Sequence, residues 1–96
     1  MAYRTTFEAE EDLAQIFAEG VADHGIVRAE AYISGLLDVL ALIGRQPLLM
    51  QLRDEYQPPV RFRVFKGHVV VYRDDDGDAL IVRVLHRRQD VSKELS

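Results

Sequence analysis

The chain has 96 residues, no cysteine and a net charge of −4. This length fits one domain spanning residues 1–96, and the missing cysteines exclude disulfides and thiolate metal sites. No apolar run reaches the roughly 18 residues that a membrane span needs, and the N-terminus does not resemble a signal peptide, so we expect a cytoplasmic protein.

A helical hairpin is expected in the N-terminal half. Residues 2–5 read as a short strand, and Thr6 is a good N-cap because its hydroxyl can accept from a first-turn N–H. Apolar residues recur at helical spacing after it: Ala9, Leu13, Ile16, Phe17 and Val21. Gly25 favours a helix end. A second helix is predicted over about 27–43, with a wider apolar stripe that indicates deeper burial.

Three strands are expected in the C-terminal half. Residues 47–59 lack a clear period and read as a surface connection with one helical turn near 49–52. The predicted strands are 60–65, 68–73 and 79–86, joined by turns at 66–67 and 74–78. Continuous apolar runs in the last two strands indicate central strands covered on both faces. The polar tail from Arg87 keeps Val91 and Leu95 as apolar anchors.

The order β-α-α-β-β-β predicts an α+β fold. In this fold an N-terminal helical hairpin packs on a small, mostly antiparallel sheet. Within the expected strand 60–65, Val60, Phe62 and Val64 share one face, while Arg61 and Arg63 share the other.

The usual catalytic and metal-binding motifs are missing. His24, His68 and His86 lack the spacing of metal ligands, and the acidic run 74–78 fails the glycine and glutamate positions of a calcium loop. No nucleophile elbow and no glycine-rich phosphate loop occurs. We therefore predict no catalytic residue, no metal and no cofactor.

Basic residues gather in the C-terminal part. Residues 1–57 hold four basic and ten acidic side chains, whereas residues 58–96 hold eight and six, so the net charges are −6 and +2. The predicted sheet carries Arg61, Arg63, Arg83, Arg87 and Arg88. These guanidiniums could hold an acidic partner or a nucleic-acid backbone, or they could pair with acids of this chain. The sequence leaves both readings open.

Several short patterns follow one another along nearly the whole chain. They are Tyr3-Arg4-Thr5-Thr6-x-x-Ala9-x-x-Asp12-Leu13-x-x-Ile16; Gly25, Ala29 and Tyr32; Leu40, Ile43 and Pro47; Arg61, Gly67 and Val69 to Arg73; and Ile81 to His86 followed by Asp90. In this order they resemble the ParE branch of the RelE/ParE toxin superfamily. One departure is Gln89, where the family commonly has arginine before its aspartate.

The resemblance implies a toxin that binds and poisons DNA gyrase. It also implies neutralisation by a ParD-like antitoxin, with no membrane association and no sequence-specific nucleic-acid binding by this chain. Candidate residues for gyrase or partner binding are Arg61, Arg63, Arg83, His86, Arg87 and Arg88. Candidate antitoxin-binding residues, taken from outward apolar helix positions and a strand arginine, are Leu13, Phe17, Leu37 and Arg63.

Two other functions stay open on the same fold. A RelE-type ribosome-dependent mRNA endonuclease would need a base, an acid and a cation, for which His86 and Arg83 or Arg87 are the candidates. In that comparison Val69 falls where enzymatic relatives commonly have an arginine. The third possibility is a non-toxic protein-interaction module.

Overall fold

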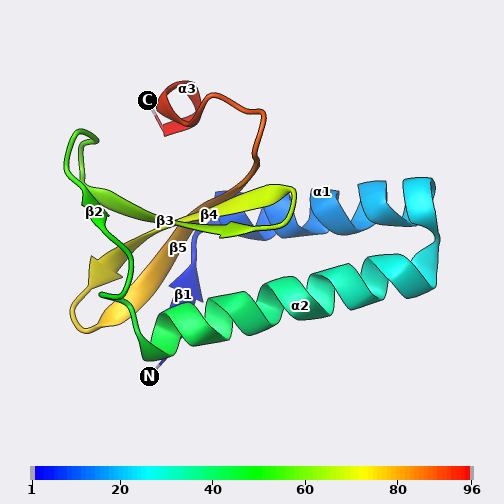
Figure 1. Cartoon of the computed structure of the whole chain (residues 1–96), viewed down its shortest axis with the longest axis horizontal. Helices are drawn as coiled ribbons and strands as arrows, with labels where there is room; N and C mark the ends of the chain where they lie inside the picture. Colours follow the sequence, from blue (N-terminus) through cyan, green and yellow to red (C-terminus); the bar gives the residue numbers. More distant parts are fainter. Residues whose placement is uncertain (1, 96) are drawn as a thin grey trace.

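A helical hairpin covers one face of a five-stranded sheet in the computed structural model, which describes residues 2–95 (Figure 1). The elements are β1 (Tyr3–Thr5), α1 (Phe7–His24), α2 (Ile26–Arg45), β2 (Leu52–Arg53), β3 (Val60–Phe65), β4 (His68–Asp75), β5 (Asp78–His86) and α3 (Val91–Leu95). The strand order is β1-β5-β4-β3-β2, with β1 parallel to β5 and the other pairs antiparallel. The predicted α+β class and helical hairpin are confirmed.

The first helix begins after Thr6 and ends before Gly25, as the sequence predicted. The Thr6 hydroxyl accepts from the Ala9 backbone N–H at 3.0 Å and donates to the Val82 carbonyl at 2.8 Å, so the cap also joins α1 to β5. Gly25 alone connects the helices, with a φ of 86° that favours glycine. The chain therefore reverses within one residue.

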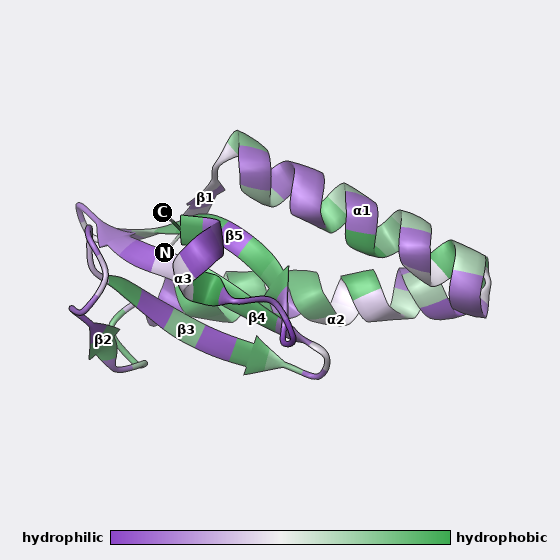
Figure 2. Ribbon diagram, turned by 90° about the horizontal axis from the view of Figure 1, so that it is seen from above, coloured by the Kyte–Doolittle hydropathy of each residue, from purple (hydrophilic) through white to green (hydrophobic). Residues whose placement is uncertain are grey.

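The core lies on both faces of the sheet. On the helix side, fully buried residues of α2 meet those of β4 and β5: Leu36, Leu40, Val70, Tyr72 and Ile81. On the other side Val60, Val69, Val71 and Leu85 form a smaller cluster against which Tyr56, Val91 and Leu95 pack. Figure 2 shows the corresponding difference between the helices, since α1 is largely hydrophilic and α2 is more apolar. The predictions of a more buried second helix and of doubly covered central strands are confirmed.

Two local predictions were wrong. Residues 49–52 form no helical turn; instead β2 pairs with Val60 and Arg61 of β3, a long-range contact that local periodicity does not reveal. The turn predicted over 74–78 is only two residues long, because β4 continues to Asp75 and pairs it with Asp78. The tail forms the short helix α3, and its predicted apolar anchors, Val91 and Leu95, both pack against the smaller core cluster as expected.

The helical hairpin projects beyond the end of the sheet, past the β3–β4 turn (Figure 1). The short helix α3 lies over the opposite face of the sheet. Among residues 2–95 there is no helix with the length and apolarity to cross a membrane. The projecting part of the hairpin and the end of the sheet together enclose the cleft described next.

Candidate functional site

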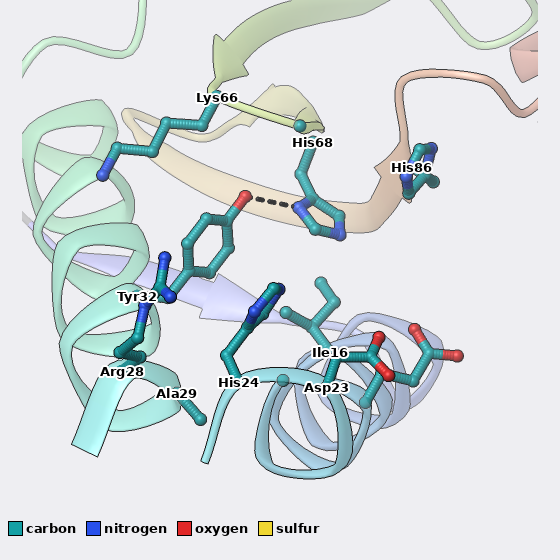
Figure 3. Close-up of a pocket in the computed structure, with 12 residues that line it drawn as sticks. Ile16, Asp23, His24, Arg28, Ala29, Tyr32, Lys66, His68 and His86 are labelled. Atoms are coloured by element: carbon teal, nitrogen blue, oxygen red, sulfur yellow. Dashed lines mark hydrogen bonds between the residues drawn. The ribbon is translucent and has the colours of Figure 1, made fainter. Parts of the chain in front are cut away.

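A cleft of about 500 Å³ lies between the projecting hairpin and the end of the sheet (Figure 3). Residues of α1 and α2 form one wall, and the β3–β4 turn and the end of β5 form the other. His24, His68 and His86, far apart in the sequence, all line it. Their convergence was not predicted, although the β3–β4–β5 meander pairs His68 with His86 directly.

Tyr32 and His68 point toward one another across the cleft (Figure 3). The Tyr32 hydroxyl lies 2.6 Å from His68 Nδ1. Burial raises the pKa of Tyr32, against a smaller lowering effect of a hydrogen bond with the Gly67 backbone, so the hydroxyl is protonated at neutral pH. Burial, followed by repulsion from His86, lowers the pKa of His68, against a smaller opposing effect of Glu19. The lowered pKa favours the neutral imidazole, and the tautomer of that ring decides which of the two groups donates in the hydrogen bond.

The turn after β5 is fixed by His86 and Gln89. The His86 N–H donates to the Gln89 side-chain oxygen at 2.8 Å, and the Gln89 N–H donates to the His86 carbonyl at 2.9 Å. His86 Nδ1 accepts from the Arg88 N–H at 3.1 Å. An arginine at position 89 has no acceptor for the His86 N–H, so the departure from the family pattern has a structural role here.

Exposed cations surround this turn. The Arg87 N–H donates to the Gly67 carbonyl at 3.0 Å, and its guanidinium reaches the Lys66 carbonyl at 3.3 Å. Among the described residues, the Arg88 guanidinium has no hydrogen-bond or ion-pair partner. The Lys66 ammonium lies 5.8 Å from the centre of the Tyr32 ring. The structure thus brings together three of the predicted residues, His86, Arg87 and Arg88, and adds Lys66. We call these four residues the basic end.

Arg61 and Arg63 lie elsewhere, on the helix-side face of β3. The Arg61 guanidinium makes two hydrogen bonds to Asp74, at 3.1 and 3.0 Å, and donates to the Met50 carbonyl. Arg63 lies with Nη1 3.9 Å from the sulfur of Met50. For Arg61 the structure favours pairing with an acid of this chain, and the bound carboxylate raises the pKa of its guanidinium.

Arg83 is also paired within the chain. Its Nε and Nη2 donate to the two oxygens of Asp12, at 2.8 and 2.9 Å, and Nη1 lies 3.4 Å from Glu94. Asp12 accepts in addition from the Val84 backbone N–H at 2.8 Å. Arg83 therefore joins α1, β5 and α3 and does not share a surface with the basic end.

The four candidate antitoxin-binding residues lie on three elements: α1 carries Leu13 and Phe17, α2 carries Leu37, and β3 carries Arg63. Leu13 is not an outward position as expected, because it packs against the core. Phe17 is half-buried, and Leu37 is 41% exposed. The helical spacing of the apolar residues in α1 was predicted correctly, but Leu13 was wrongly expected to face outward.

The cleft shows no obvious metal chemistry. Within residues 2–95, no three His, Asp or Glu side chains are arranged to hold a metal ion. Glu19 and Asp23 line the wall formed by α1, so the cleft contains both signs of charge. Its chemistry is hydrogen bonding by histidine, tyrosine and flexible cations.

The comparison with protein-family models identifies one family. The model of the family described as ParE toxin of a type II toxin–antitoxin system, parDE, matches residues 3–91. A solved structure titled "Chromosomal ParDE TA system from P. aeruginosa" is similar with a TM-score of 0.78 and 18% identity, over 90% of this chain and 95% of that chain. A comparison with curated proteins finds no match. At this identity the structural likeness concerns the fold alone.

Proposed function

The chain belongs to the ParE toxin family of type II toxin–antitoxin systems, and we propose that it arrests bacterial growth by binding and poisoning DNA gyrase. The observation that most supports a binding mechanism is the basic end. Arg87 and Arg88 are exposed, and backbone hydrogen bonds fix the turn that carries them. A guanidinium offers five donors in a planar arrangement that fits carboxylates and phosphates, both of which a gyrase–DNA complex presents.

The arginines that the sequence offered as binding candidates differ in role. His86, Arg87 and Arg88 are the proposed gyrase contacts. Arg61 and Arg83 instead stabilise the fold, because each guanidinium is already bound by a carboxylate.

A ParD-like antitoxin is the proposed partner. The solved structure that this chain resembles is titled as a ParDE system, which supports a partner of that kind. Of the apolar candidates for its binding site, Leu37 is the exposed one, and half-buried Phe17 is the second. A segment that folds on the toxin would cover such apolar side chains.

Expression in a bacterial host tests the proposal. The wild-type chain is expected to stop growth, induce the DNA-damage response and trap gyrase on broken DNA. Arg87→Ala/Arg88→Ala is expected to lose all three effects. Arg45→Ala is the matched control, since Arg45 is an exposed arginine at the far end of α2. Arrest without DNA damage would refute the gyrase target, and absence of arrest would favour a non-toxic interaction module.

RNA cleavage is the second candidate, because His68 and His86 lie in one cleft with ring centres 5.4 Å apart. Their hydrogen bonds weigh against it. Nδ1 of each ring is already hydrogen-bonded, to the Tyr32 hydroxyl in His68 and to the Arg88 N–H in His86. Only one nitrogen of each ring, Nε2, is therefore left for a 2′-hydroxyl or a leaving group. Cut transcripts that disappear in His86→Ala would support the nuclease and overturn the binding mechanism.

A further inference from the structure

A second cleft lies on the face of the sheet opposite the helical hairpin. Its volume is about 500 Å³, and it is bounded by α3, by the loop between β2 and β3, and by β4 and β5. Its apolar walls are formed by Tyr56, Val60, Leu80, Val82 and Leu95. Of these only Val60 is buried, so the fold leaves apolar surface of the other four uncovered. The size and the apolar lining of the cleft fit a small organic ligand.

Arg73 supplies the positive charge of this second cleft. It is a partly buried residue of β4 and lines the cleft beside Leu80, its partner on β5. Among residues 2–95 its guanidinium has no hydrogen-bond or ion-pair partner, whereas Arg61 and Arg83 of the same sheet are each bound by a carboxylate. A guanidinium that has lost part of its water without gaining an acceptor is destabilising, and a bound anion would offset that cost.

The other polar groups of the second cleft also favour an anion. Among the lining residues Glu55 is the only one with a carboxylate, and Arg53 already binds it at 2.8 Å. The Thr6 hydroxyl is used within the fold as both donor and acceptor. The hydroxyls of Tyr56 and Ser92 have no partner in the described part of the chain, so both can donate to a ligand. The cleft therefore offers donors and no unpaired acid.

We propose that the second cleft binds a small organic carboxylate with an apolar body. The carboxylate accepts from the Arg73 guanidinium, and the apolar body lies against Leu80, Val82 and Leu95. One guanidinium suits the single charge of a carboxylate better than the double charge of a phosphate monoester, which would favour a second cation. Because Leu95 belongs to α3, the ligand also joins that short helix to the sheet. The cleft contains no residue of the basic end, so this inference does not depend on gyrase binding.

Methyl nuclear magnetic resonance of the full chain tests the proposal. The probe is phenylacetate, and phenylacetamide is its neutral control of nearly the same shape. With phenylacetate, the largest saturable shifts are expected at the methyl groups of Leu80, Val82 and Leu95, at the millimolar concentrations that suit a ligand of this size. The amide is expected to bind at least about tenfold more weakly, because it cannot form the charge-assisted pair with Arg73.

Two arginine variants make the test specific. Arg73→Met keeps an apolar stem but removes the guanidinium, so it is expected to lose the preference for the acid over the amide. Arg63→Met is the matched control, because Arg63 is a partly buried arginine on the helix-side face, beside Met50, and should bind as the wild type does. Comparing the two probes on the wild type keeps the test valid even if Arg73→Met fails to fold. Equal binding of acid and amide, no saturable shift up to about 10 mM, or largest shifts at Ile16 and Ala29 of the first cleft would each overturn the proposal.

Discussion

Asp12 has a larger structural role than an exposed first-turn acid would have. Its carboxylate accepts two hydrogen bonds from Arg83 and one from the Val84 N–H, and the two side chains are only 15% and 21% exposed. Removing one partner of a fully buried pair costs about 3–5 kcal/mol, and an orphaned backbone N–H costs about 1–3 kcal/mol. Because Asp12 and Arg83 keep some contact with solvent, the cost of breaking their ion pair is smaller than in a fully buried pair. Asp12→Ala is therefore expected to lower the free energy of unfolding by about 3–4 kcal/mol.

Two companion variants make the test specific. Asp12→Asn retains one acceptor for the Val84 N–H but loses the charge, so we expect about half the loss of Asp12→Ala. Glu11→Ala is the control, because Glu11 is exposed and should change stability by less than about 0.5 kcal/mol. Urea denaturation followed by circular dichroism measures all three. A loss below about 1 kcal/mol for Asp12→Ala would refute the argument and return Arg83 to the candidate contact surface.

Three further expectations concern packing and pH. A Cβ added at Gly44 would lie 3.0 Å from the backbone of Ala2, so Gly44→Ala should cost about 1–3 kcal/mol in urea denaturation. Gly35→Ala should cost less, since the neighbour at 3.0 Å is the movable ring end of Phe65 and the helix gains propensity. A loss for Gly35→Ala as large as that for Gly44→Ala would contradict this account. Because the pKa of His68 is lowered in the folded state, its contribution to stability is present above the ordinary value of about 6.5 and is lost as pH falls below it. His68→Gln should therefore flatten the stability profile below about pH 6.5, and an unchanged slope would contradict the assignment.

Strong local signals in the sequence predicted most of the fold. Thr6 and Gly25 bound α1 as expected, and the limits of β3 were predicted correctly. The errors arose where distant residues decide the structure. Leu52 becomes a strand residue only because Arg61 lies beside it. Asp74 and Asp75 were assigned to a turn because they are acidic, but they lie in β4, where Arg61 and Arg4 bind their carboxylates.

The candidate site was less predictable than the fold. Position in the sequence placed His86, Arg87 and Arg88 together, but Tyr32, His68 and Lys66 join them only through the projection of the hairpin and the β3–β4 turn. From its position in a predicted strand, Arg83 was expected to share a binding surface with the other arginines of the sheet. In the structure the register of β4 and β5 skips Val82, and Arg83 binds Asp12 of α1. An irregularity of this kind has no signal in the alternation of side chains.

The most direct test of the central claim uses purified gyrase, supercoiled plasmid and the purified chain. Denaturing the mixture with detergent reveals the linear DNA that results when gyrase is trapped in its cleaved state. The wild type is expected to accumulate linear DNA, Arg45→Ala should match it, and Arg87→Ala/Arg88→Ala should require at least tenfold more protein. If the folded wild-type chain neither binds gyrase nor traps cleaved DNA, this protein is not a gyrase poison.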